Sequence, residues 1–306
     1  MRDYLYSAGL LLFGVIIAVV IPLILSFTNN LVVKAQIPQN NAQVAGVQKY
    51  NIPPVGKNLP MPFFTARAVL VKDLGTETVL YQKDSNISYP IASTTKIMTA
   101  LVANEYFKQN SVLIVGSSAN ISGSRVGLAY GEDLTFRSLL YGMLLNSGND
   151  AAFALAENYP GGLLGFVSAM NKKVIELGLK NTRFDNPAGF DSPNHYSSAG
   201  DLAKITQEAI KNPNLARIFA TKETNIVSVN KQYTHQLFNL NRLLSDVKGV
   251  LGVKTGRTEG AKENLVTLVQ RDGHKILLVI LGSDDRFGET TGLINWAYSN
   301  FQWAKN

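Results

Sequence analysis

Residues 90–99 read Pro-Ile-Ala-Ser-Thr-Thr-Lys-Ile-Met-Thr, and an apolar stretch follows them. This pattern predicts a helix that begins near Ser93. On a helix, residues three apart lie on one face, so the Ser93 hydroxyl and the Lys96 amine can meet. Lysine can act as the base that a weak serine nucleophile needs if burial or neighbouring cations lower its pKa. The other interpretation is a capping serine with an exposed lysine, and Ser-x-x-Lys also occurs at residues 228–231 and 245–248.

A second short motif, Ser147-Gly148-Asn149, follows an apolar stretch in the middle of the chain. As a functional element, it would bring a second hydroxyl near Lys96 to relay a proton, and an amide to hold Lys96 and a substrate. As a structural element, it would be a turn between helices, capped by Asn149 or Asp150.

The third motif is Lys254-Thr255-Gly256, which occurs once in the chain. A strand that carries lysine and threonine at the mouth of a cleft can bind a terminal carboxylate. Gly256 would let a substrate backbone approach closely. The alternative is a polar edge strand or a turn.

In this chain order, the three motifs match the signature of penicillin-binding proteins and class A β-lactamases. Residues 90–99 resemble the Pro-x-Ala-Ser-x-Thr-Lys-x-Met-Thr form of D-alanyl-D-alanine carboxypeptidases, which are serine peptidases of the S11 type. Ser-Gly-Asn at 147–149 is similar to that family rather than to the Ser-Asp-Asn of lactamases. Residues 181–189 and 195–197 also resemble it, and the resemblance runs from about Phe63 to Trp296. Residues 261–264 depart from it, because they read Ala-Lys-Glu-Asn where the family has Ala-Gly-x-Cys.

The resemblance implies a catalytic role for three residues. Ser93 would form the acyl-enzyme, Lys96 would be its general base, and Ser147 would assist proton transfer. The implied substrate-binding residues are Asn149, Lys254, Thr255, Gly256 and Arg257. In that set, Lys254 and Thr255 would bind the carboxylate, and the backbone N–H of Arg257 would complete an oxyanion hole with that of the serine.

The expected function is therefore a D-Ala-D-Ala carboxypeptidase that trims peptidoglycan stem peptides in the cell wall, without a cofactor. β-Lactams should acylate the same serine. Three alternatives stay open: an endopeptidase of the same family that cuts crosslinks, a class A-like β-lactamase, and a non-catalytic wall-binding scaffold. The lactamase is disfavoured because no Glu-x-x-x-Asn follows the second motif, where Asp185-Asn186 stands instead.

The expected fold class is α+β, and the resemblance implies a β-lactamase/transpeptidase-like fold. Apolar and turn patterns predict an antiparallel sheet formed by both chain ends, packed with helices, and a mostly helical central insertion. A hairpin is expected at 66–81, and Asp272-Gly273 predicts a second one. The remaining expected elements are strands at 264–270 and 275–282, and helices at 139–145, 151–156, 166–177 and 289–303.

The amino-terminal segment has a different character. Residues 8–25 contain no charged side chain and approach the roughly 20 apolar residues of a spanning helix. We therefore expect a transmembrane anchor or signal segment at 1–28, an extended linker at 29–62, and a catalytic domain at 63–306 on the extracytoplasmic side. An uncleaved anchor is favoured because the apolar run is long, although Val33-Lys34-Ala35 leaves cleavage open.

Composition excludes several classes of function. There are no cysteines, so disulfides and thiolate zinc sites are excluded. The net charge is +7, but the basic residues are scattered, so no nucleic-acid partner is expected. His195, His235 and His274 lack metal-ligand spacing, so no metal site is expected. The sequence leaves open the oligomeric state and the third residue of the stem peptide.

Overall fold

The computed structural model describes residues 52–304. The chain divides into two compact units, residues 1–43 and 44–306, and every described residue belongs to the second. The apolar stretch at 8–25 lies outside the described residues, so the predicted anchor stays a prediction. Within residues 52–304, no helix is long and apolar enough to cross a membrane.

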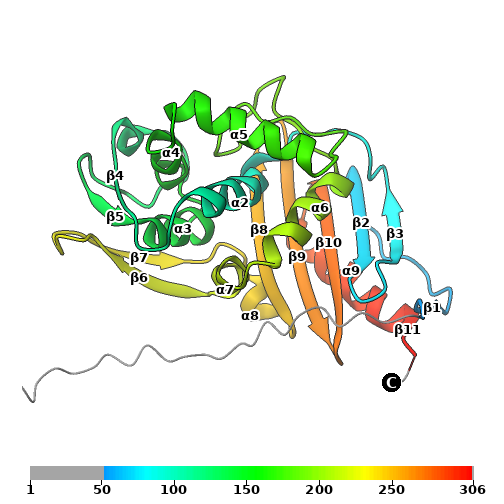
Figure 1. The fold of residues 1–306 in the computed structure, drawn as a ribbon. Coiled ribbons are helices and arrows are strands. Elements are labelled where there is room, and N and C mark those ends of the chain that lie inside the picture. Colours follow the sequence, from blue (N-terminus) through cyan, green and yellow to red (C-terminus); the bar gives the residue numbers. More distant parts are fainter. Residues whose placement is uncertain (1–51, 305–306) are drawn as a thin grey trace, which may run out of the picture. The chain divides into compact units, whose positions relative to one another are not determined.

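A five-stranded antiparallel sheet is built from both ends of the described chain (Figure 1). Its strands, in spatial order, are β3 (Val79–Lys83), β2 (Ala68–Asp73), β10 (His274–Ser283), β9 (Lys262–Arg271) and β8 (Val250–Thr258). The early strand β2 pairs with the late strand β10, as the sequence predicted. Strand β8, which carries the third motif, lies at one edge of the sheet.

Both predicted hairpins are present. Asp272 and Gly273 join β9 to β10 with φ angles of 49° and 82°, the left-handed values that a type I′ turn needs. In the turn between β2 and β3, the Asp73 carboxylate accepts hydrogen bonds from the Thr76 backbone N–H at 2.8 Å and from the Thr76 hydroxyl at 2.7 Å. Local turn chemistry thus accounts for both connections.

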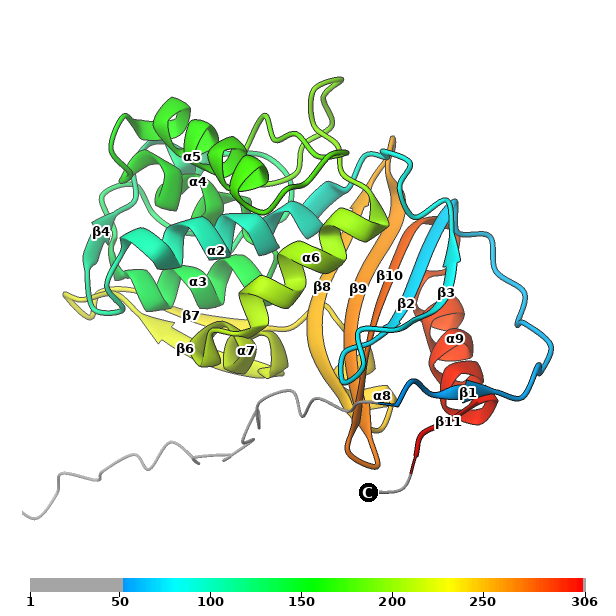
Figure 2. The same cartoon turned by 45° about the vertical axis from the view of Figure 1, so that its right-hand side comes forward.

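The sheet is buried on both faces. Leu277 and Val279 of β10 join the larger apolar cluster, whereas Ile276 and Leu278 join a second cluster on the opposite face. This alternation follows from the two-residue period of a strand. Figure 2 shows α6 and α7 on one side of the sheet and α9 on the other. The second face is covered by α8 (Leu243–Asp246) and α9 (Arg286–Asn300).

The chain between β3 and β8 forms the mostly helical insertion. It contains η1 (Ala92–Thr95), α2 (Lys96–Tyr106), β4 (Val112–Ile114), η2 (Ser117–Asn120), β5 (Asp133–Thr135), α3 (Phe136–Leu145), α4 (Asn149–Glu157), α5 (Gly162–Glu176), α6 (Ala199–Ile210), α7 (Pro213–Ala220), β6 (Glu223–Val227) and β7 (Thr234–Phe238). The three helices predicted in the middle of the chain are α3, α4 and α5. The small sheets β4–β5 and β6–β7 were not predicted.

Helix α2 runs through the interior of the insertion. Every side chain from Lys96 to Ala103 is buried, which explains why the sequence shows no polar face there. Lys96 is the one ionisable residue in this buried run, so the fold buries its amine at the start of the helix.

The closing helix begins and ends earlier than predicted. Asp285 caps α9, because its carboxylate accepts a hydrogen bond from the Gly288 N–H at 3.0 Å. The helix ends at Asn300, because the next residues are extended in β11 (Phe301–Gln302), which pairs with β1 (Val55–Gly56).

Candidate active site

The first motif spans the junction of η1 and α2. The Lys96 amine donates a hydrogen bond to Ser93 Oγ at 2.9 Å. Residues i and i+3 eclipse one another in a 3₁₀ turn, so this short helix aligns the two side chains more directly than an α-helix would. Ala92 has a φ of +48°, and this left-handed residue sets the direction of the chain into Ser93.

Lys96 is enclosed by oxygen acceptors. Besides Ser93, its amine reaches Asn149 Oδ1 at 2.8 Å and the Ala188 backbone carbonyl at 2.7 Å. Burial lowers the pKa of Lys96 well below its usual value, and the nearby Lys254 cation lowers it further, while Asp150 opposes them. The site therefore favours an uncharged amine that can accept the Ser93 proton.

The second motif is the turn between α3 and α4. Asn149 bridges two segments: its Oδ1 faces Lys96, and its Nδ2 donates to the Ser122 carbonyl at 2.8 Å. Ser147 is 3% exposed and has a φ of +57°, a conformation that is strained for a residue with a Cβ. The Ser147 hydroxyl forms no hydrogen bond to any other described residue.

The third motif lies on β8 beside the Ser93 turn. A Cβ on Gly256 would stand 3.0 Å from both the Ile91 carbonyl oxygen and the Ser93 nitrogen, so any side chain there would press against the turn that carries the serine. Lys254 and Thr255 are both buried, and the Lys254 amine donates to the Thr255 carbonyl at 3.2 Å.

Lys254 is a second perturbed amine. Burial, followed by the Arg286 charge, lowers its pKa to about 7. The structure thus brings the three motifs, which are far apart in the chain, to one place. The chemical roles assigned to them stay predictions.

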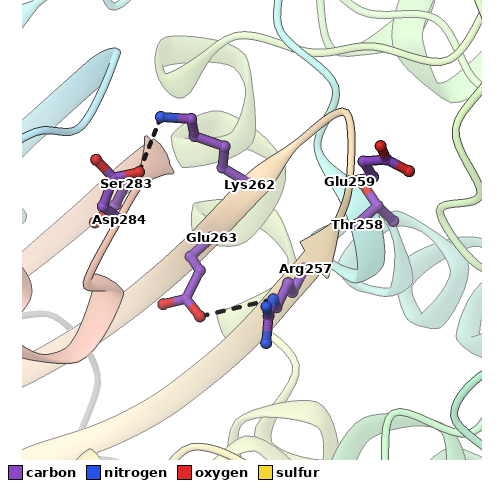
Figure 3. Close-up of a pocket in the computed structure, with 7 residues that line it drawn as sticks. All are labelled: Arg257, Thr258, Glu259, Lys262, Glu263, Ser283 and Asp284. Carbon is purple, nitrogen blue, oxygen red and sulfur yellow. Dashed lines mark hydrogen bonds and ion pairs between the residues drawn. The ribbon is translucent and has the colours of Figure 1, made fainter.

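Arg257 is placed differently from the other predicted residues. Its side chain is 74% exposed and lies 3.9 Å from the Glu263 carboxylate. Figure 3 shows it at a pocket of about 580 Å³ where β8 turns into β9. Gly256, the residue before Arg257, is the one that adjoins the Ser93 turn. The pocket is lined by Arg257, Thr258, Glu259, Lys262, Glu263, Ser283 and Asp284, so it is separate from Ser93 and Lys96.

Sequence reasoning missed Arg286, at the start of α9. Its Nη1 donates to the Gly256 carbonyl at 3.2 Å, and its Nε is buried with no hydrogen-bond partner among residues 52–304. Burial lowers the pKa of Arg286, yet a guanidinium stays charged in proteins. It adds a permanent positive charge beside Lys254, and no short motif marks it.

Asn264 was also missed as a positioning residue. Its Nδ2 donates to the Pro90 carbonyl at 3.1 Å, and its Oδ1 accepts from the Gly282 N–H at 2.8 Å. It lies in the 261–264 stretch that departs from the expected pattern. The buried amide ties the segment before Ser93 to the sheet, so this departure contributes to the site's framework.

The described residues contain no group of three or more His, Asp or Glu side chains that could hold a metal ion. The half-buried Ser93, the buried Lys96 and Lys254, and Arg286 are suited to acyl transfer on a substrate that carries a carboxylate.

Comparison with known proteins agrees with this geometry. The profile of the peptidase S11 family, described as D-alanyl-D-alanine carboxypeptidase, matches residues 57–285. The chain belongs to the S11 peptidase family.

Among S11 relatives, the chain is 35% identical to the D-alanyl-D-alanine carboxypeptidase DacF of Bacillus subtilis, over 78% of this chain and 63% of DacF. It thus spans less than two thirds of that relative. It is 33% identical to the D-alanyl-D-alanine endopeptidase of Pseudomonas aeruginosa, over 80% of this chain and 81% of the relative. The crystal structure of the Streptomyces K15 DD-transpeptidase has a TM-score of 0.74 and 32% identity, covering 79% of this chain and 100% of the other. The expected fold is therefore confirmed.

Proposed function

We propose that this S11 peptidase is a serine-type D-Ala-D-Ala carboxypeptidase that removes the terminal D-alanine of peptidoglycan stem peptides. The observation that carries the proposal is the contact between the buried Lys96 amine and Ser93 Oγ at 2.9 Å. A buried, uncharged amine at this distance is a competent general base.

Acylation begins when Ser93 Oγ attacks the carbonyl carbon of the penultimate D-alanine and its proton passes to Lys96. The bond from that carbon to the nitrogen of the terminal D-alanine then breaks. The leaving amine takes its proton from the Lys96 ammonium, by way of the Ser147 hydroxyl. Ser147 is available for this relay because no other described residue occupies its hydroxyl.

Two groups of residues stabilise the substrate and the transition state. The backbone N–H groups of Ser93 and Arg257 would hold the developing oxyanion, and the tight approach of Gly256 to Ser93 supports this placement. Lys254, with Thr255, would bind the terminal carboxylate. Arg286 reinforces this subsite with a charge that does not titrate.

The ester at Ser93 is then hydrolysed by water, which releases the shortened stem peptide and restores the hydroxyl. Lys96 takes a proton from the attacking water and passes it to Ser93 Oγ as the ester bond breaks. No cofactor enters this sequence. A β-lactam presents a strained amide and a carboxylate to the same groups, so it should acylate Ser93.

Intact-mass spectrometry after incubation with a β-lactam tests the proposal. The wild-type protein should gain the mass of one β-lactam, and Ser93→Ala should gain none. In parallel, a stem pentapeptide should lose one D-alanine with the wild type alone. An unmodified wild-type protein would contradict the proposal and favour the non-catalytic scaffold.

Endopeptidase activity is a second candidate, because the P. aeruginosa relative is named an endopeptidase. Cleavage of crosslinks uses the same acylation step with a larger leaving group. Digestion of purified crosslinked and uncrosslinked muropeptides separates the two activities by the product that accumulates. A class A-like β-lactamase is separated by the lifetime of the adduct, since rapid turnover of the β-lactam would favour it.

We further propose that residues 1–28 anchor the protein in the cell membrane and place residues 63–306 on its extracytoplasmic side. The uncharged run at 8–25 supports this placement. Fractionation should find the protein in membranes, accessible to protease in spheroplasts. The mass of the mature amino terminus distinguishes an anchor from a cleaved signal.

A further inference from the structure

His195 is a buried histidine whose ring joins two segments of the site. It is 2% exposed. Its Nε2 lies 2.7 Å from Thr95 Oγ1, and its Nδ1 accepts a hydrogen bond from the Asp185 N–H at 3.0 Å. Thr95 Oγ1 in turn donates to the Ala92 carbonyl at 2.8 Å. The ring therefore connects the 185–190 segment to the turn that carries the nucleophile.

The surroundings of the ring select one tautomer. Nδ1 faces the Asp185 N–H and, at 3.4 Å, the Asn186 amide nitrogen. That amide is oriented by its oxygen, which accepts hydrogen bonds from three backbone N–H groups, those of Ala188, Gly189 and Phe190. Both neighbours of Nδ1 are donors, so the ring proton must be on Nε2 and must be donated to Thr95.

This chain of hydrogen bonds leads to Ser93 at one end and to Lys96 at the other. On one side, Thr95 supports the Ala92 carbonyl, and Ala92 has the strained φ of +48° directly before Ser93. On the other side, the segment that begins at Asp185 leads to the Ala188 carbonyl, which accepts from the Lys96 amine at 2.7 Å. The imidazole thus sets the distance between the turn that carries Ser93 and the Ala188 carbonyl, which orients the Lys96 amine.

We propose that His195 is a positioning residue for acylation, acting as a neutral imidazole with its proton on Nε2. The proposal rests on the proposed roles of Ser93 and Lys96. His195 transfers no proton; it holds both reacting groups in place through Thr95 and the 185–190 segment.

The charged groups around the ring leave it neutral. Burial lowers the pKa of His195 to about 4, although the Asp185 and Asp191 carboxylates favour the cation, and Lys96 disfavours it. A protonated ring would turn an Nδ1–H toward the Asp185 N–H, where no acceptor is available. The positioning effect should therefore persist unchanged from neutral pH to about pH 5.

Two substitutions separate positioning from simple loss of stability. His195→Phe keeps a ring but removes both hydrogen bonds, and His195→Gln retains an N–H that can reach Thr95. The rate of acylation by a fluorescent penicillin should fall about 30- to 100-fold in the Phe variant, since small displacements of reacting groups have effects of this size. The Gln variant should recover to within about tenfold of the wild type. Should the Phe variant fail to fold, Thr95→Val removes the hydrogen bonds of Thr95 to the ring and to the Ala92 carbonyl, and it should also acylate at least tenfold more slowly than the wild type.

His235→Gln is the matched control, because His235 bonds with Glu132 on another part of the fold. It should acylate at the wild-type rate. Imidazole carbon and nitrogen chemical shifts, assigned with these variants, should show His195 neutral with an Nε2–H from pH 8 to pH 5.

An Nδ1–H tautomer, a cation at pH 6, or a folded Phe variant that acylates at the wild-type rate would overturn the proposal. Failure of the proposed function is a different outcome, since the wild-type protein itself would then take up no penicillin.

Discussion

At the residue scale, Lys96 is suited to its proposed role because burial lowers its pKa and its contacts allow an uncharged amine. A neutral amine has two N–H donors and one lone pair. Once the amine is neutral, its two donors can serve Asn149 Oδ1 and the Ala188 carbonyl, at 2.8 and 2.7 Å, and the lone pair then replaces the N–H that faces Ser93 Oγ at 2.9 Å. No carboxylate contacts the amine among residues 52–304, so nothing in contact offsets the cost of burying its charge.

The two buried lysines predict a bell-shaped pH dependence of acylation. Lys96 must be neutral, so the rate falls as the pH drops through its lowered pKa. Lys254 must be charged, so the rate also falls as the pH rises above about 7 in the free protein. Each limb should approach a tenfold change per pH unit. Stopped-flow acylation by a β-lactam, measured as the second-order rate constant, reports both limbs.

Lys254→Arg tests which limb belongs to which amine. A guanidinium stays charged throughout the range, so the alkaline limb should disappear while the acid limb stays in place. If the alkaline limb remained near pH 7 in this variant, Lys254 would not be its source.

The sequence alone was sufficient to predict that side chains within one short motif lie close together. Ser93 and Lys96 are three residues apart, and local helical geometry brings them together. Arg286 enters the site from the start of a distant helix, where neither spacing nor composition marks it. The Ala188 carbonyl is a backbone group, and its position depends on the tertiary path of the chain rather than on its side chain.

At the element scale, Asp150 ties the start of α4 to the preceding loop. Its carboxylate accepts hydrogen bonds from the N–H groups of Val126, Gly127 and Leu128 at 3.0, 2.8 and 3.2 Å. The same loop provides the Ser122 carbonyl that holds Asn149. One buried carboxylate therefore shapes the loop on which the second motif depends.

Asp150→Asn should have two separable effects. An amide offers one acceptor oxygen in place of two, so at least one backbone N–H of the loop loses its acceptor. The free energy of unfolding should therefore fall by about 1–3 kcal/mol. Because Asp150 raises the pKa of Lys96, its loss should also move the acid limb of acylation to lower pH. Urea denaturation and the pH profile measure the two effects. The exposed Asp246→Asn is the control and should change neither, whereas an acid limb that moved to higher pH would contradict the electrostatic argument.

Helices and strands were predicted correctly where the apolar pattern was strong, and they were missed or misplaced where that pattern was weak or where an end depends on a distant strand pairing. The strands at 264–270 and 275–282 are apolar and share a two-residue turn, so both were predictable. Strands β4 and β6 are short and pair within small satellite sheets, which gives only a weak periodic signal. Helix α9 stops at Asn300 because Phe301 pairs with Gly56, a contact that no local pattern contains.

At the scale of the whole unit, α9 connects the site to the opposite end of the sheet. It starts at Arg286, beside Gly256, and its 15 residues rise about 22 Å along the helix axis. At its far end, the backbone carbonyl of Asn300 accepts from the Lys57 N–H at 2.8 Å, and its side chain accepts from the Leu59 N–H at 2.7 Å. The amino-terminal segment of the described chain is thus fastened far from Ser93.

This separation predicts that stability and acylation can be changed independently. Asn300→Ala leaves the part-buried Leu59 N–H without its acceptor and should lower the free energy of unfolding by about 1–2 kcal/mol. Acylation by a β-lactam should proceed at the wild-type rate, because Arg286 and β8 stay in place. The neighbouring exposed Ser299→Ala is the matched control and should stay within about 0.5 kcal/mol of the wild type. Slower acylation in folded Asn300→Ala would show instead that α9 transmits strain from the amino-terminal attachment to the carboxylate subsite.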